Sequence, residues 1–152
     1  MAYQYNNNSR RQNKPAYKDE AEPAKEIFAQ RPFLKSWIET GADENLPAYA
    51  EYMGKSMADN QLTSSKIRSI YGEIKRIQMG QFEKGKASFY LLRPKVAYAV
   101  GRDKKNTGLQ LFKLVFDVAA QYVKDDNTFK HFANFMEAVL AYHRANVKKT
   151  ND

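Results

Sequence analysis

The sequence predicts an all-α fold, a single compact bundle of five to six helices behind a disordered N-terminal tail. Apolar residues recur almost everywhere at intervals of three and four, and no segment shows the alternation of a half-buried strand. A length of 152 residues fits one domain with one core. We therefore expect a helical bundle domain at residues 27–147, between disordered ends at 1–26 and 148–152.

The predicted tail, residues 1–26, is rich in asparagine and mixed charge and contains almost no aliphatic side chains. Such a segment buries too little apolar surface to offset the entropy lost on ordering. After it, Pro32 is predicted to begin a short helix that carries Trp37 and that Gly41 ends. Pro47 fits the first turn of the next helix, where a missing backbone N–H costs nothing.

The clearest helix starts after Thr63 or Ser64, either of which can cap its N-terminus. Its apolar positions are spaced by three and four residues: Ile67, Ile70, Tyr71, Ile74 and Ile77. Residues 89–101 are predicted to form a further helix. Pro94 implies a break or kink near residues 91–93, because proline lacks the N–H of the helical ladder and its ring clashes with the preceding turn.

Two strongly apolar helices close the sequence, at residues 109–123 and 129–147. The connection between them, residues 124–128, is short and polar. An Asp or Asn in this connection can cap the last helix. Together these segments give the five to six helices of the predicted bundle.

The net charge of +8 is confined to one internal stretch. Residues 61–105 carry eleven Lys and Arg against three acids, a net of +8, and the rest of the chain sums to zero. A surplus confined in this way is typical of a basic face that binds an anionic partner. Few acids lie in the stretch to pair with its cations, which distinguishes it from an ordinary solvated surface.

Helical geometry arranges some of these cations in two stripes. At 100° per residue, Ser64, Arg68, Tyr71 and Lys75 share a band about 60° wide, and Lys95, Tyr98 and Arg102 share another. Each stripe holds two cations seven residues apart, a rise of about 10.5 Å. That spacing allows contact with phosphates one or two apart on a single strand.

The sequence offers little material for catalysis or metal binding. There is no cysteine, and the two histidines, His131 and His143, lie 120° apart on one helix. Glu137 and His143 leave a small nuclease as one possible reading, but no nucleophile signature or phosphate-binding loop accompanies them. We expect no enzyme activity, no cofactor and no metal. We expect His131 to be exposed and His143 to have a structural role.

No apolar run approaches the length of a membrane span, and the N-terminus lacks the apolar core of a signal peptide. The absence of cysteine fits a reducing compartment. These observations predict a cytoplasmic protein without a membrane partner.

Three stretches of the sequence, residues 62–71, 92–102 and 132–143, together resemble one family. In one-letter code they read LTSSKIRSIY, LRPKVAYAVGR and FANFMEAVLAYH. In this order and spacing they are similar to the small helical subunit of the Csm complex, the type III-A CRISPR effector, with the related subtype III-D as an alternative. The resemblance covers about residues 46–147, so the first 45 residues extend beyond it.

The resemblance implies a non-catalytic protein of antiviral defence that stacks in several copies beside the other subunits of the effector complex. It implies that these copies hold guide RNA and target RNA by their backbones, without reading the base sequence. The residues that match the basic RNA-facing pattern are Arg68, Lys95 and Arg102, with Lys66, Lys75 and Arg93 as neighbours.

A helical adaptor remains the alternative from another class. Its basic face would bind an acidic protein partner, and RNA would play no part.

Overall fold

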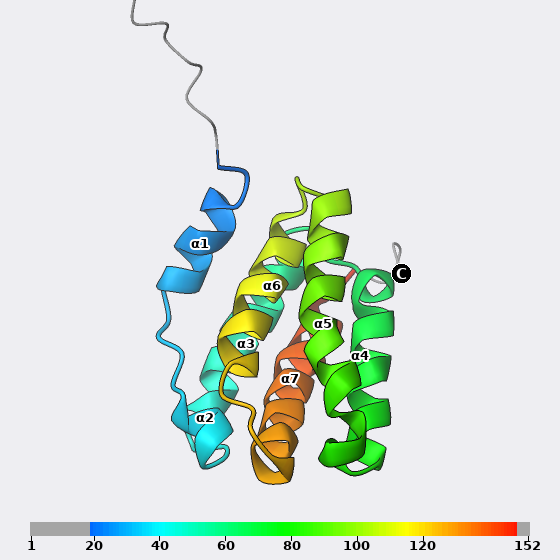
Figure 1. Cartoon of the computed structure of the whole chain (residues 1–152). Coiled ribbons are helices and arrows are strands. Elements are labelled where there is room, and N and C mark those ends of the chain that lie inside the picture. The colour runs from blue at the N-terminus through cyan, green and yellow to red at the C-terminus, as the bar shows by residue number, and fades with distance from the viewer. Residues whose placement is uncertain (1–18, 149–152) are drawn as a thin grey trace, which may run out of the picture.

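A computed structural model describes residues 19–148 of the chain, and this part consists of seven helices without a strand (Figure 1). The predicted all-α class is correct, and the helix number is higher than the five to six predicted. The helix without a predicted counterpart is a short one at Glu22–Ala29. The predicted disorder at residues 1–18 and 149–152 lies outside the described residues.

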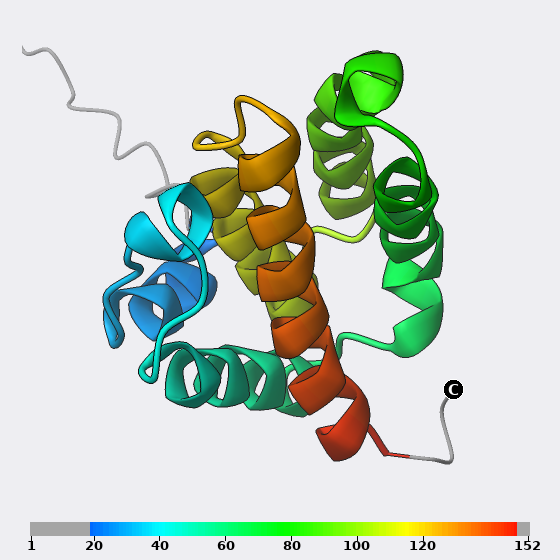
Figure 2. The ribbon, with the colours of Figure 1, turned by 90° about the horizontal axis from the view of Figure 1, so that it is seen from below.

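The core is built on the crossing of α3 (Leu46–Asp59) and α7 (Asp126–Asn146), the most extensive helix pair (Figure 2). Gly54 lies at the crossing, and a Cβ atom there would come within 2.4 Å of the Val139 carbonyl oxygen. The missing side chain lets the two backbones approach closely. Pro47 stands in the first turn of α3, as the sequence predicts.

The helix α1 (Glu22–Ala29) starts five residues before the predicted domain boundary at Ile27. It packs on α6 (Thr107–Ala120), and its Ala24 is fully buried. Pro23 in the first turn starts this helix despite the polar composition of the segment. Five residues of the segment predicted to be disordered are therefore helical.

The helix α2 (Ser36–Glu39) is a single turn that packs on α7. It starts four residues after Pro32, so the proline precedes this helix and does not begin it. Gly41 follows the helix with a φ of +116°, a conformation that favours glycine, which confirms the predicted end. The Trp37 indole is buried and donates to Oδ1 of Asp43 at 2.7 Å.

The helices α4 (Ser64–Met79) and α5 (Phe82–Arg102) form an antiparallel hairpin on one side of the bundle, opposite α1 and α2 (Figures 1 and 2). Thr63 holds the predicted N-cap position of α4, although its side chain makes no cap hydrogen bond. The α5 helix starts seven residues earlier than predicted and runs through Pro94 without the predicted break. Pro94 itself is exposed.

The last two helices match their predicted positions within three residues at each end. Asp125 caps α7 in a capping box with Thr128, which confirms the predicted Asp or Asn cap. Phe129 and Phe132 of α7 pack against Phe82 and Phe89 of α5. This phenylalanine cluster fixes the hairpin of α4 and α5 to the rest of the core.

Candidate nucleic-acid interface

The basic stretch folds into α4, α5 and the connections around them. The buried isoleucines of α4 face the core, which leaves two flanks of the helix exposed. One flank faces α5 and the other faces α7. The predicted cations are divided between these two flanks and the outer side of α5.

The first flank forms an open groove of about 580 Å³ between α4 and α5. Lys66 from α4 and Lys95 from α5 line this groove, with Tyr98 beside them. The Tyr98 ring is 66% exposed, and the Arg102 guanidinium lies over it at 5.7 Å from the ring centroid. At this surface α4 therefore presents the cation of Lys66, and α5 presents the cation of Lys95 with the aromatic ring of Tyr98.

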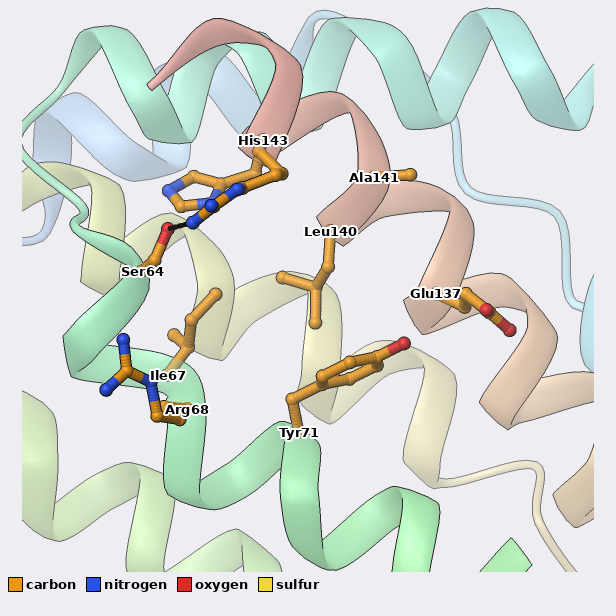
Figure 3. A pocket seen from close by; sticks show the side chains of 9 residues that line it. Ser64, Ile67, Arg68, Tyr71, Glu137, Leu140, Ala141 and His143 are labelled. Carbon is orange, nitrogen blue, oxygen red and sulfur yellow. Dashed lines mark hydrogen bonds between the residues drawn. The ribbon is translucent and has the colours of Figure 1, made fainter. Parts of the chain in front are cut away.

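The second flank forms a hollow of about 360 Å³ between α4 and α7 (Figure 3). Ser64, Arg68 and Tyr71 line it, as their predicted common band requires. Lys75 continues the band toward Glu137 of α7. The structure thus keeps each predicted stripe together on its own helix but places Arg68 and Lys66 on opposite flanks of α4.

Three of the six predicted site residues form ion pairs. Lys66 pairs with Asp103 at 3.4 Å, within the basic stretch itself. The other two partners come from distant helices: Glu137 of α7 lies 3.3 Å from Lys75, and Asp117 of α6 lies 3.3 Å from Arg93. The expected shortage of acids in the stretch is therefore partly offset by acids from elsewhere in the fold.

Lys75 has an aromatic contact in addition to its acid partner. A hydrogen bond to Glu137 raises the pKa of Lys75, and contact with Tyr71 raises it further. The ammonium also lies 5.5 Å from the centroid of the Tyr71 ring. Lys75 is thus part of a contact between α4 and α7 as well as a surface cation.

The remaining three predicted residues, Arg68, Lys95 and Arg102, are exposed. No ion pair involves them within residues 19–148. Glu73 is the nearby acid of α4: a hydrogen bond from Arg76 lowers its pKa, with a smaller electrostatic contribution from Lys95. Among the six predicted site residues, these three cations are therefore the most available to an anionic ligand.

Both histidines have structural partners. His143 is buried, and its Nε2–H donates to the Leu62 carbonyl oxygen at 2.7 Å. His131 is half-buried, where the sequence predicts exposure, because its Nδ1 lies 2.8 Å from the Ile38 carbonyl oxygen of α2. No group of three or more His, Asp or Glu side chains that suits a metal ion occurs in the described part of the chain.

Arg144 is a basic residue of this surface that the sequence prediction missed. It lines the hollow from α7, and its Nη1 donates to Oγ of Ser64 at 3.4 Å. Arg144 lies 76 residues beyond Arg68 and outside the basic stretch, so no feature of the sequence associates the two. Only the packing of α7 beside α4 brings them to one hollow.

None of the helices within residues 19–148 has the length and hydropathy of a membrane span. No curated protein and no solved structure matches the chain. A protein-family model described as Csm2 Type III-A matches residues 41–149, which include the whole α4 and α5 hairpin. The chain therefore belongs to the Csm2 Type III-A family, the small subunit of the type III-A CRISPR effector complex.

Proposed function

We propose that this chain is a non-catalytic subunit that grips guide RNA and target RNA by their backbones, without base selectivity, in antiviral defence. The observation that carries the proposal is the set of three exposed cations without an acid partner on two adjacent helices, Arg68 on α4 with Lys95 and Arg102 on α5. Several copies stack head to tail in the effector complex, so that weak contacts from each copy add.

The contacts are mainly to phosphate, because guanidinium and ammonium groups neutralise the backbone whatever the base sequence. Tyr98 adds a sequence-tolerant surface on which a base can stack. Three unpaired cations per copy give an expected slope of about −2 for the logarithm of the binding constant against the logarithm of salt concentration on single-stranded RNA.

The test is a double charge reversal, Lys95→Glu with Arg102→Glu, measured by fluorescence anisotropy on single-stranded RNA of several sequences. We expect a loss of affinity of about 100-fold or more at low salt for every sequence, since about two phosphate contacts become repulsive. The matched control is Arg31→Glu with Lys35→Glu, an equal charge change beside α1 and α2 on the opposite side of the bundle (Figure 2). Equal losses in both double variants would contradict a defined surface.

The adaptor alternative gives the opposite result in the same experiment. Leu91 of α5, an apolar side chain that is 58% exposed, lines the groove beside Lys95 and favours some protein contact on this face. If the α5 double variant keeps its RNA affinity and loses a protein partner from the complex, the basic face serves protein binding.

A further inference from the structure

The hollow between α4 and α7 combines an apolar floor with a basic end. Ile67, Leu140 and Ala141 supply the apolar surface, and the Tyr71 ring stands beside them (Figure 3). Its volume of about 360 Å³ lies at the small end of the range of small-molecule sites, about 300–1,000 Å³. A site of this size suits one flat ring system with a short polar attachment.

The polar groups of the hollow are separated along its length. Ser64 and Arg68 lie at one end and Glu137 at the other, with Tyr71 between them (Figure 3). Arg144 joins the Ser64 end through its hydrogen bond to the hydroxyl oxygen. The Glu137 carboxylate is paired with Lys75, so it adds little repulsion toward an anion. Two guanidinium groups, those of Arg68 and Arg144, therefore line the Ser64 end.

We propose that this hollow binds one unpaired nucleotide of an RNA strand. Its phosphate lies between Arg68 and Arg144, and its base lies on the apolar floor beside Tyr71. The inference rests on the proposed function and adds a specific site to it, which includes a residue of α7 outside the basic stretch. Guanidinium groups bind phosphate through paired hydrogen bonds, and a tyrosine ring accepts any base by stacking.

The combination of groups argues against simpler ligands. A phosphate ion alone would gain nothing from Leu140 and Ala141, and an apolar ligand would gain nothing from two arginines. An RNA duplex presents its bases stacked inside the helix, so only an unpaired nucleotide reaches an apolar floor. The ligand is therefore a nucleotide from a single-stranded segment.

The first test fills the hollow without changing charge. Ala141 is exposed, so Ala141→Phe adds a ring to the floor with little effect on the core. We expect the affinity of the full chain for a single-stranded 12-mer to fall about 10-fold, the loss of one stacked base. Ala48→Phe, at an exposed alanine of α3, is the matched control and should change affinity less than about 2-fold.

The second test removes the guanidinium that the sequence did not indicate. Arg144→Ala should weaken binding about 10-fold, and Arg31→Ala, with the same charge change on the opposite side of the bundle, should do so less than about 3-fold. A 4-thiouridine-labelled RNA should crosslink to Tyr71 or to residues 137–144, as mapped by mass spectrometry. Ala141→Phe should abolish that crosslink.

Two results together would overturn the nucleotide site and leave the proposed function standing. RNA affinity would be unchanged in Ala141→Phe and in Arg144→Ala, and it would still fall in the double variant Lys95→Glu with Arg102→Glu. A wild type without RNA affinity would overturn both. Titration with uridine 5′-monophosphate distinguishes a free nucleotide from a nucleotide within an RNA strand as the ligand of the hollow. Binding of this free nucleotide as tight as that of the 12-mer would overturn the assignment to an RNA strand.

Discussion

Nζ of Lys75 on α4 lies 3.3 Å from Oε1 of Glu137 on α7, 62 positions later in the chain. The pair joins two helices at the edge of the α4–α7 hollow, and both side chains remain about half exposed. An exposed pair of this kind adds little to stability, typically about 0–1 kcal/mol. Its main effect is on charge, because it reduces what Lys75 offers to an anion.

Replacing Glu137 by Gln should therefore strengthen RNA binding. The change frees the Lys75 ammonium while keeping a side chain of the same size, and we expect about a 2- to 5-fold gain in affinity at low salt. Fluorescence anisotropy on single-stranded RNA measures it. Glu51→Gln on α3 makes the same change in net charge at a remote exposed site and controls for long-range attraction. An equal gain in both variants would show that pairing with Lys75 is irrelevant.

Two glycines in helix interiors should respond in opposite directions to alanine. Gly54→Ala places a Cβ within 2.4 Å of the Val139 carbonyl oxygen and 2.7 Å of the His143 backbone nitrogen. The Cβ forces α3 and α7 apart where they cross, so we expect the free energy of unfolding to fall by about 1–3 kcal/mol. Gly72→Ala on α4 meets no atom within 4 Å and should gain about 0.5–1 kcal/mol. Urea unfolding followed by circular dichroism measures both.

The cap of α7 should make stability depend on acid pH. Hydrogen bonds from Thr128 hold the pKa of Asp125 below its ordinary value of 3.8. A depressed folded-state pKa stabilises the fold at pH values above 3.8, and this contribution disappears as the pH falls through the folded-state pKa. Asp125→Asn should therefore lower Tm at pH 7, and its difference from wild type should shrink as the pH falls below 3.8. A difference independent of pH would exclude the carboxylate charge as its cause.

Replacing the buried His143 should lower stability, and replacing the half-buried His131 should lower it much less. His143→Leu leaves the Leu62 carbonyl without its donor, and we expect a loss of about 1–3 kcal/mol in the free energy of unfolding. His131→Leu removes the contact with the Ile38 carbonyl at a site that water reaches, so its loss should be smaller. Urea unfolding ranks the two, and the reverse order would contradict the structural role of His143.

The large helices were predictable because their apolar periodicity and their caps agree. Ile67 to Ile77 recur on one face of α4, and Pro47 and Asp125 stand where the starts of α3 and α7 require them. The two helices before residue 41 were partly or wholly missed for a physical reason. Only Ala24 of α1 is buried, and α2 is a single turn, so neither leaves a clear periodic signal.

At Pro94 the local preference of proline does not decide the structure, because α5 continues through it. The sequence predicts a break, but residues 89, 92 and 96 of α5 all pack into the core on one continuous face. That burial outweighs the one hydrogen bond that proline removes from the helical ladder. Pro94 itself lies on the exposed side of α5, where it lines the groove beside α4.

The two stripes of the candidate site were predictable because helical spacing alone places Arg68 near Tyr71 and Lys95 near Tyr98. Their pairing with acids was not. Glu137 and Asp117 come from other helices, and local spacing carries no information about contacts between helices. The same limit applies to Arg144, which joins the hollow only through the packing of α7.

The burial of Trp37 and Ile38 bears on where this protein can be shortened. The match to the family begins at residue 41, yet both side chains lie in the core, exposed by 2% and 0%, and α2 packs on α7. A chain trimmed to the shared residues would uncover the α7 surface beneath them and the α6 surface beneath α1. The described residues that precede the family match are thus an integral part of the same core.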